Sequence, residues 1–328
     1  MSNIASAPLG LDETDIAIIR AFYGDAHFYS ARSEIRESIS RISKRLDIAE
    51  STVRKRVGRY MKSGFVTGWN FILNPTITGE SVAQVRLDIL PPSAKDDVLQ
   101  KLKLIEDVWI VTRYHENVVG VGVYYRGAES LRKKVELMAM IANSEHVDYG
   151  QVALPPCNHP FTATDIEIIR SIEENPRKGL ASVADETRLS AKTVKRRIDR
   201  MVSERALFIS PVVNFEKLRG VIAADLFVFY TSREAATETE EGVLSIAGIR
   251  AYYAAIRNPE HTMLGLFLMS MKEEDEMLAK LKKLRGIRAA YLDLVTEYIG
   301  VYQAFKDRID LVAKQFGSRN RQIATLRA

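Results

Sequence analysis

The sequence predicts an α+β protein in which one structural unit is used twice. Residues 14–20 (TDIAIIR) return as residues 164–170 (TDIEIIR), and residues 52–61 (TVRKRVGRYM) return as residues 193–202 (TVKRRIDRMV). The first pair is 150 residues apart and the second pair 141, so the first copy is expected to hold about nine extra residues within 25–37. Three prolines in residues 154–160 interrupt both helix and strand, which marks the boundary between the copies.

The composition fits a protein with several packed domains. The chain has 328 residues, of which 46% are hydrophobic, and carries a formal net charge of +5. At about 100–200 residues per domain, this length supports more than one domain, and the apolar content excludes global disorder. The longest apolar run, 221–230, contains Asp225, and the first residues lack a secretion signal, so we expect a cytoplasmic protein without a membrane span. The single cysteine, Cys157, excludes an intrachain disulfide.

Three helices and a short strand are predicted at the start of each unit. In the first copy, Asp12 is expected to cap the first helix, with Asp15 three residues later. A second helix follows over 39–46, and a third is expected to begin at Ser51 as its N-cap and to end at Gly64. The strand follows at 65–72. In the second copy, the corresponding helices are predicted at 164–173, 180–187 and 191–204, and the strand at 208–213.

Strands and helices alternate in the second part of each unit. In the first copy, strands are predicted at 85–89, 108–111, 118–125 and 147–154, and helices at 96–104 and 129–143. In the second copy, the same order is predicted at 222–230, 239–246, 249–256, 262–271, 273–284 and 289–296. The order β-α-β-β-α-β is typical of a ferredoxin-like domain. Residues 299–316 are predicted to form a further helix that docks on a neighbouring domain or on a second chain.

The third helix of each unit has one apolar and one cationic face. Val53, Val57 and Tyr60 share one face of the first, and Lys55 and Arg59 lie opposite them. Basic residues recur at four matched positions of the two helices. A short helix, a turn and such a helix form a helix-turn-helix motif that binds duplex DNA. The candidate DNA-binding residues are Ser51, Thr52, Arg54, Lys55, Arg56, Arg59 and Lys62 in the first copy, and Lys192, Thr193, Lys195, Arg196, Arg197 and Arg200 in the second.

The alternative is that these cationic faces are ordinary solvent-exposed helix surfaces that bind nothing. The absence of acidic residues from 51–62, and the recurrence of the pattern, favour DNA binding. The strand after each third helix predicts a winged variant, with Lys62, Trp69 and Asn70 near the DNA backbone. The predicted domains are therefore winged helix-turn-helix domains at 1–74 and 157–215, ferredoxin-like domains at 75–156 and 216–300, and a C-terminal helix with a basic tail at 301–328.

These motifs resemble the Lrp/AsnC family of transcriptional regulators, also called feast/famine regulators. The resemblance rests on residues 48–57 (IAESTVRKRV), 64–68 (GFVTG) and 189–198 (LSAKTVKRRI), with Asn214 and Gly220. It implies a sequence-specific DNA-binding regulator and not an enzyme, which binds double-stranded DNA, needs no cofactor and forms homodimers or higher oligomers through its ferredoxin-like domains. Family members have one unit per chain, so this chain is expected to form an intrachain pseudo-dimer. Its half-sites would lie about 34–36 Å apart, or a multiple of that distance.

The resemblance also implies a small-molecule effector, often an amino acid in this family. The turn between the second and third strands of the sensing domain lines the family's effector site. The usual glycine-rich, Asp-containing turn is absent from both copies here. The aligned polar residues are His115, Glu116 and Asn117 in the first copy, and Asn258, Glu260 and His261 in the second. The alternative is that both are exposed turns that bind nothing.

Two other functions are compatible with the sequence. Siroheme decarboxylases resemble Lrp-type proteins and occur as two-part or fused chains; a tetrapyrrole would be held here by Arg113, Tyr114, His115, Arg257 and His261. The basic third helices of both copies argue against that enzyme. A nonspecific architectural DNA-binding protein is the other alternative. The five histidines lack the spacing of metal ligands, so no metal site is predicted.

Overall fold

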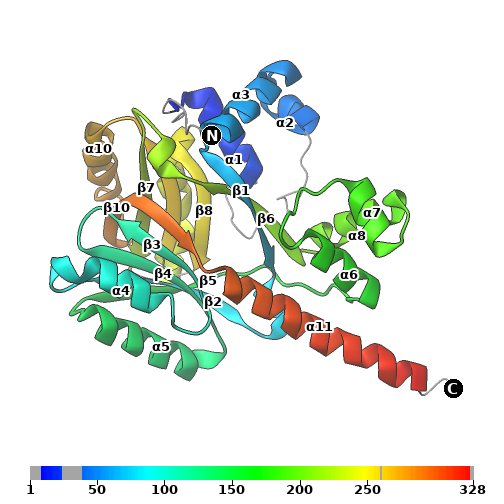
Figure 1. Cartoon of the computed structure of the whole chain (residues 1–328). Coiled ribbons are helices and arrows are strands. Elements are labelled where there is room, and N and C mark those ends of the chain that lie inside the picture. Colours follow the sequence, from blue (N-terminus) through cyan, green and yellow to red (C-terminus); the bar gives the residue numbers. More distant parts are fainter. Residues whose placement is uncertain (1–8, 24–38, 259–260, 326–328) are drawn as a thin grey trace.

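The computed structural model describes residues 9–23, 39–258 and 261–325. Two groups of three helices lie beside a large curved sheet, and a long C-terminal helix projects away from the sheet (Figure 1). The first group and its strand are α1 (Glu13–Tyr23), α2 (Ile39–Leu46), α3 (Glu50–Ser63) and β1 (Val66–Leu73). The second group and its strand are α6 (Ala163–Ile172), α7 (Leu180–Thr187), α8 (Ala191–Ser203) and β6 (Leu207–Val213). The extra segment predicted at 25–37 lies outside the described residues.

The caps of these helices explain where they begin and end. Asp12 and Asp15 each accept a hydrogen bond from the other's backbone N–H at the start of α1, which confirms Asp12 as its N-cap. Gly64 ends α3 in the left-handed region, at φ +75°, as predicted. The prediction that Ser51 caps α3 is wrong. Ala49 is the N-cap and provides no side-chain hydrogen bond, whereas Ser190 at the matched position of α8 accepts one from the backbone N–H of Thr193 at 3.1 Å.

The strands after α3 and α8 do not form wings. β1 and β6 pair with each other in an antiparallel ribbon, from Val66 opposite Val213 to Leu73 opposite Leu207. The prediction of a winged motif is therefore wrong, because each unit provides one strand and its partner comes from the other unit. Trp69 packs its ring edge-on against Phe22, and the Arg177 guanidinium lies 4.4 Å above it. Trp69 thus joins the two helical groups.

The remaining strands form one eight-stranded sheet in the order β5-β2-β4-β3-β10-β7-β9-β8. Each half of it has the strand order of a ferredoxin-like domain, and β3 joins β10 antiparallel at the middle. The strands are β2 (Ser81–Asp88), β3 (Val108–Tyr114), β4 (Val118–Tyr125), β5 (Val147–Val152), β7 (Ile222–Tyr230), β8 (Ala251–Asn258), β9 (His261–Leu268) and β10 (Ile287–Gly300). The helices between them are α4 (Lys95–Leu102), α5 (Gly127–Ala142), α9 (Arg233–Ala247) and α10 (Met271–Leu281). Short 3-10 turns lie at Pro75–Thr78, Pro92–Ala94, Phe215–Lys217 and Gly248–Arg250.

The sheet curls, so that its two halves face each other across a buried core. Arg86 of β2 binds Asp293 of β10 at 2.7 Å, although two strands lie between β2 and β10 in the sheet. Tyr114 of β3 and Tyr298 of β10 both donate to the fully buried Asp225 of β7, each at 2.8 Å. The outer faces carry separate apolar cores beneath α4 and α5 and beneath α9 and α10. The halves therefore share both a strand pair and a polar core.

The C-terminal helix α11 (Tyr302–Thr325) docks on the rest of the chain, as the sequence predicted for residues 299–316. It packs against α6, β1 and β3. Ile309 and Val312 are buried in the same apolar core as α6 and α8. No helix within the described ranges is both long and apolar enough to pass through a membrane.

Candidate nucleic-acid interface

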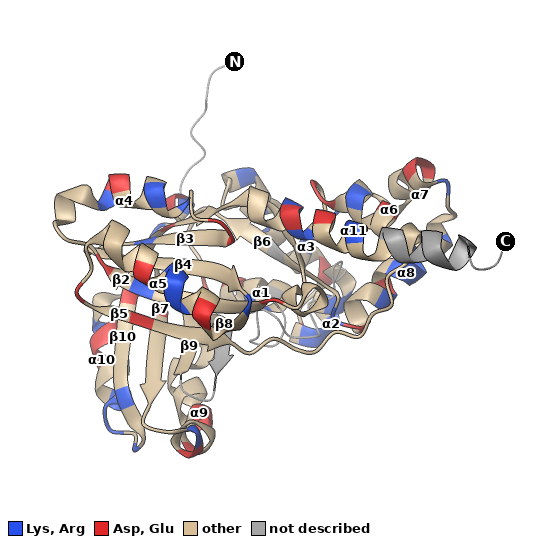
Figure 2. Ribbon diagram, turned by 90° about the horizontal axis from the view of Figure 1, so that it is seen from below, with Lys and Arg blue, Asp and Glu red and all other residues tan. Residues whose placement is uncertain are grey.

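Helix α8 presents a cationic face to solvent. Val194, Ile198 and Met201 are buried, as their spacing predicted. The exposed residues of the opposite face are Lys192, Lys195, Arg196 and Arg200, and Thr193 is half-buried beside them. Figure 2 shows basic residues along this helix. The apolar stripe thus holds α8 on α6 and α7, and the basic face points outward.

The cations of this face differ in their partners. Lys195 pairs with Asp199, and Arg200 Nε lies 2.9 Å from Glu204 Oε1, each one helical turn away. Within the described parts of the chain, Lys192 and Arg196 have neither an ion pair nor a side-chain hydrogen bond. Exposed pairs such as Lys195 with Asp199 are worth about 1 kcal/mol or less, so they open easily for a better partner. Lys192 and Arg196 need no such release to contact a phosphate.

Arg197 has a different environment. Its Nη1 lies 2.8 Å from Oδ1 of Asp165, which is buried at the start of α6. Burial alone would raise the pKa of Asp165, but the nearby His159 and hydrogen bonds from Thr162 and Arg197 outweigh it and hold that pKa well below its usual range. Arg197 is thereby held against its own domain.

Helix α3 repeats this arrangement with more of its cations engaged. Arg56 binds Asp12 at 2.6 Å and Asp15 at 2.8 Å, and Arg59 binds Asp15 at 2.6 Å. The buried Tyr60 hydroxyl also donates to Asp15, and burial together with that carboxylate raises the pKa of Tyr60 far above its ordinary value. Asp15 therefore orders three side chains of α3.

The other candidates on α3 are exposed or half-buried. Arg54 pairs with Glu50 at 2.6 Å within the helix. Lys55 and Lys62 are exposed and have no acidic partner among the residues that the structure describes. The hydroxyl residues of the first turn are Ser51, which is exposed, and Thr52, which is half-buried. The repeated Asp in TDIxIIR and the repeated Arg in the third helix were the signals from which the Asp15–Arg56 and Asp165–Arg197 pairs could have been predicted.

A histidine connects the linker between the units to the second helical group. His159 is 6% exposed; its Nδ1 contacts Glu204, and its Nε2 lies 3.6 Å from Oδ2 of Asp165. Burial lowers the pKa of His159, but the two carboxylates outweigh burial and raise it above its ordinary value. Protonated His159 thus supports the carboxylate that holds Arg197.

This cluster predicts a pH dependence of stability. Because the pKa of His159 is raised in the folded chain above 6.5, its contribution is complete below about pH 6.5 and is lost as the pH rises through the folded value. We expect His159→Gln to lower the free energy of unfolding more at pH 6 than at pH 9, as measured by urea denaturation. His115→Gln, at an exposed histidine, is the control. An equal loss at both pH values would contradict the assignment.

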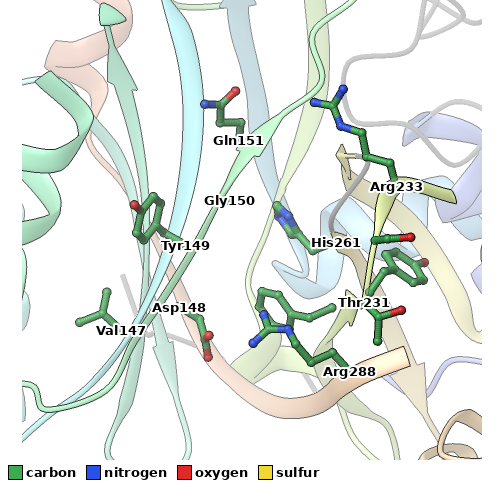
Figure 3. Close-up of a pocket in the computed structure, with 12 residues that line it drawn as sticks. Val147, Asp148, Tyr149, Gly150, Gln151, Thr231, Arg233, His261 and Arg288 are labelled. Carbon is green, nitrogen blue, oxygen red and sulfur yellow. The ribbon is translucent and has the colours of Figure 1, made fainter. Parts of the chain in front are cut away.

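The effector candidates of the first copy lie in the turn between β3 and β4. His115, Glu116 and Asn117 are exposed, and Lys95 Nζ donates to the backbone carbonyl of Glu116. Glu260 lies outside the described residues, and the side chain of Asn258 is not described. His261 is buried and lines a cavity of about 520 Å³ between β5 and the second half of the sheet (Figure 3).

The residues named for a tetrapyrrole are also dispersed. Arg113 pairs with Asp96 and lies 3.8 Å from Glu297, and Tyr114 is buried against Asp225. The side chains of Arg113, Tyr114, His115 and His261 are described. Of these four residues, His261 lines the cavity and the other three do not. Among the described residues, no group of three or more His, Cys, Asp or Glu side chains could hold a metal ion.

Comparisons with known proteins place the second helical group in a family. Residues 161–202, which span α6, α7 and most of α8, match the AsnC-type helix-turn-helix domain. The HTH-type transcriptional regulator Ptr1 of Methanocaldococcus jannaschii is 33% identical over 98 residues, 30% of this chain and 60% of that protein, so the match spans less than two thirds of this relative's length. An HTH-type transcriptional regulator of Pyrococcus horikoshii is 36% identical over 121 residues, 36% of this chain and 71% of that protein.

A solved structure matches both halves of the chain. The siroheme decarboxylase NirDL superposes with a TM-score of 0.51 over 93% of this chain and 99% of its own, at 14% identity. At that identity, the likeness is one of fold. The helical groups and the curved sheet thus recur together in another protein.

Proposed function

The chain belongs to the Lrp/AsnC family of helix-turn-helix regulators, and from that premise we propose that it regulates transcription by binding specific sequences in double-stranded DNA. The observation that carries this proposal is the outer face of α8. There, Lys192 and Arg196 are exposed and form no ion pair with any described residue, on the third helix of the matched motif. A cationic side chain that is not paired within the protein is available to contact DNA phosphates or the base edges of the major groove.

The two third helices have unequal roles in this proposal. Arg56 and Arg59 of α3 are held by Asp12 and Asp15, and this leaves Lys55 and Lys62 as the exposed cations without acidic partners among the described residues. Lysine binds phosphate as a point charge, whereas arginine can donate two parallel hydrogen bonds to guanine. We therefore assign base reading mainly to α8 through Arg196, and backbone contacts mainly to α3.

The proposed domain arrangement is a duplicated unit that forms an intrachain pseudo-dimer. We propose that the domains have the boundaries predicted from the sequence, and that the two helix-turn-helix domains lack wings. The ribbon of β1 and β6 ties the two helical groups together, so the separation of α3 and α8 is set by the fold. We further propose that the ferredoxin-like halves mediate association with other copies and that a small molecule modulates DNA binding.

The replacement of Arg196 tests the proposal. Arg196→Ala is expected to weaken binding to a selected duplex by about 1–3 kcal/mol, roughly 5- to 150-fold, because Arg196 is proposed to read a base. The duplex would be selected from fragmented genomic DNA and its affinity measured by fluorescence anisotropy at one fixed salt concentration. Arg132→Ala is the matched control, since Arg132 is an exposed arginine on α5, paired with Glu136.

The same assay separates the alternatives. A sequence-specific regulator keeps its selected duplex in the presence of excess unrelated DNA, whereas an architectural protein loses it. Absence of duplex binding, or equal losses in the Arg196 and Arg132 variants, would contradict the proposal. Incubation with an iron tetrapyrrole tests the enzyme alternative, because binding would change the visible absorption spectrum.

A further inference from the structure

The turn between α6 and α7 reaches from the second helical group to the first. The guanidinium of Arg177 in this turn lies 4.4 Å from the centre of the Trp69 ring in β1 and 5.9 Å from the centre of the Phe22 ring in α1. The Phe22 and Trp69 rings pack edge to face, with their centres 5.3 Å apart. β1 and β6 run between the two helical groups (Figure 1). The three side chains therefore join α1, the ribbon and the second group at one point.

Aromatic rings hold the Arg177 side chain in place. Arg177 is half-buried, and its guanidinium forms neither an ion pair nor a hydrogen bond with a described residue. Burial lowers the pKa of Arg177, but a guanidinium still carries its charge at neutral pH. The face of an indole ring attracts a cation, and the attraction is stronger where water is partly excluded. The Trp69 ring is therefore the main partner of this cation.

The turn that carries Arg177 is fixed within its own group. The Asn175 side chain accepts a hydrogen bond from the backbone N–H of Arg177 at 3.2 Å. Lys178 Nζ donates to the backbone carbonyl of Ser171 at 3.0 Å and lies 2.7 Å from Oε2 of Glu186. Because these bonds tie the turn to α6 and α7, a contact made by Arg177 constrains the whole second group.

The two helical groups rest on different parts of the chain. α1 packs against β8 in the second half of the sheet, whereas α6 packs against α11, which also contacts β3 in the first half. The ribbon connects the groups at the ends of α3 and α8, since each of these helices is followed directly by a ribbon strand. Attachment at one end of a helix does not by itself fix its direction. The Arg177 contact adds a second attachment between the groups.

Trp69 distinguishes the first copy from the second. At the spacing of 141 residues that separates the third helices, Ser210 takes the place of Trp69, and Pro211 lies opposite Trp69 in the ribbon. Neither residue has an aromatic face for a cation. Two identical subunits related by symmetry would have such a contact on both sides or on neither. The duplicated chain can instead fix the two groups from one side.

We propose that Arg177 is a positioning residue for DNA recognition, which holds α8 and α3 in the relative orientation that lets both contact one duplex. This inference rests on the proposed function, because it concerns the same two helices. When two binding elements are held rigidly, the second contact forms at a high effective concentration. When their orientation varies, only the fraction of molecules in the right arrangement gains from the second contact.

The distance between the two groups tests the positioning without DNA. Spin labels are attached at Lys44→Cys on α2 and Asp185→Cys on α7, both exposed positions outside the candidate DNA-binding residues, and Cys157→Ser removes the one native cysteine. Double electron–electron resonance is expected to give a narrow distance distribution, which Arg177→Gln widens about twofold or more because the cation–π contact is lost. Arg132→Gln, at an exposed arginine of α5, is the control. An unchanged distribution in the Arg177 variant overturns the inference.

Duplex length tests the consequence for DNA. A selected duplex is compared with a truncated duplex that keeps the half-site whose affinity depends on Arg196. The full duplex is expected to bind the unmodified chain about tenfold more tightly than the truncated one, or more, and Arg177→Gln is expected to reduce this gain to about threefold or less. Its affinity for the truncated duplex should stay within about twofold of that of the unmodified chain.

A conservative variant separates positioning from a direct DNA contact. Arg177→Lys keeps the charge but loses the planar group that stacks on Trp69, so it should behave like Arg177→Gln. The inference is overturned if Arg177→Lys keeps the full gain, or if Arg177→Gln weakens binding to both duplexes equally. Circular dichroism verifies that each variant is folded. Absence of all duplex binding would overturn the proposed function and the role in DNA recognition, whereas the distance distributions show independently whether Arg177 fixes the two groups.

Discussion

Arg308→Met is expected to lower the free energy of unfolding by about 3–5 kcal/mol, because it leaves a buried carboxylate without its cation. Arg308 is 3% exposed on α11 and binds Glu80 through two nitrogens, at 3.0 and 3.2 Å. It also donates to Asp107 at 2.5 Å and lies 4.0 Å from the centre of the Tyr124 ring. Urea denaturation at pH 7 measures the loss.

Control variants separate the buried charge from loss of packing. Asp107 keeps Lys134 at 2.9 Å, whereas Glu80 keeps the Thr78 hydroxyl at 2.7 Å and a distant Arg126, so the loss falls mainly on Glu80. Adding Glu80→Gln to Arg308→Met is therefore expected to restore part of the stability. Arg132→Met, which breaks an exposed pair, should cost about 0.5 kcal/mol or less. An Arg308 variant as stable as the Arg132 variant would contradict this interpretation.

Local patterns predicted the elements, and contacts between distant segments explain what the sequence analysis missed. The spacing of Val194, Ile198 and Met201 predicted the buried face of α8 because a helix repeats every 3.6 residues. The β1–β6 ribbon depends on the pairing of strands more than 130 residues apart in sequence, which no local pattern specifies. A single strand with unpaired backbone groups needs a partner, and the other unit supplies it.

The candidate DNA-binding site was likewise predicted in part from local patterns. The basic face was predicted residue by residue, but which cations are available for DNA was not. That depends on Asp15 and Asp165, which lie in the first helix of each group and reach across to the third. The cavity around His261 was beyond prediction, because its walls come from β5 and from the second half of the sheet. The sequence analysis named His261 as an effector candidate in a turn, and the structure shows that it is buried.

Removal of three cations from α8 is expected to have the largest effect on DNA binding. In Lys192→Ala/Lys195→Ala/Arg196→Ala, affinity for a selected duplex is expected to fall about 100-fold or more at 100 mM salt, which is about 2.7 kcal/mol. The loss combines one base contact with two phosphate contacts. Fluorescence anisotropy with a labelled duplex measures it. The control with the same charge change is Lys280→Ala/Lys282→Ala/Lys283→Ala, at exposed positions of α10 and the turn after it.

The dependence of duplex affinity on salt concentration tests the central claim most directly. Each phosphate contact contributes about 0.9 to the slope of log affinity against log salt. If the cationic face of α8 binds DNA, the triple α8 variant should have a slope shallower than that of the unmodified chain by about two, and the α10 variant should keep the original slope. The same slope for the α8 variant and the unmodified chain would show that DNA, if bound, lies elsewhere on the molecule.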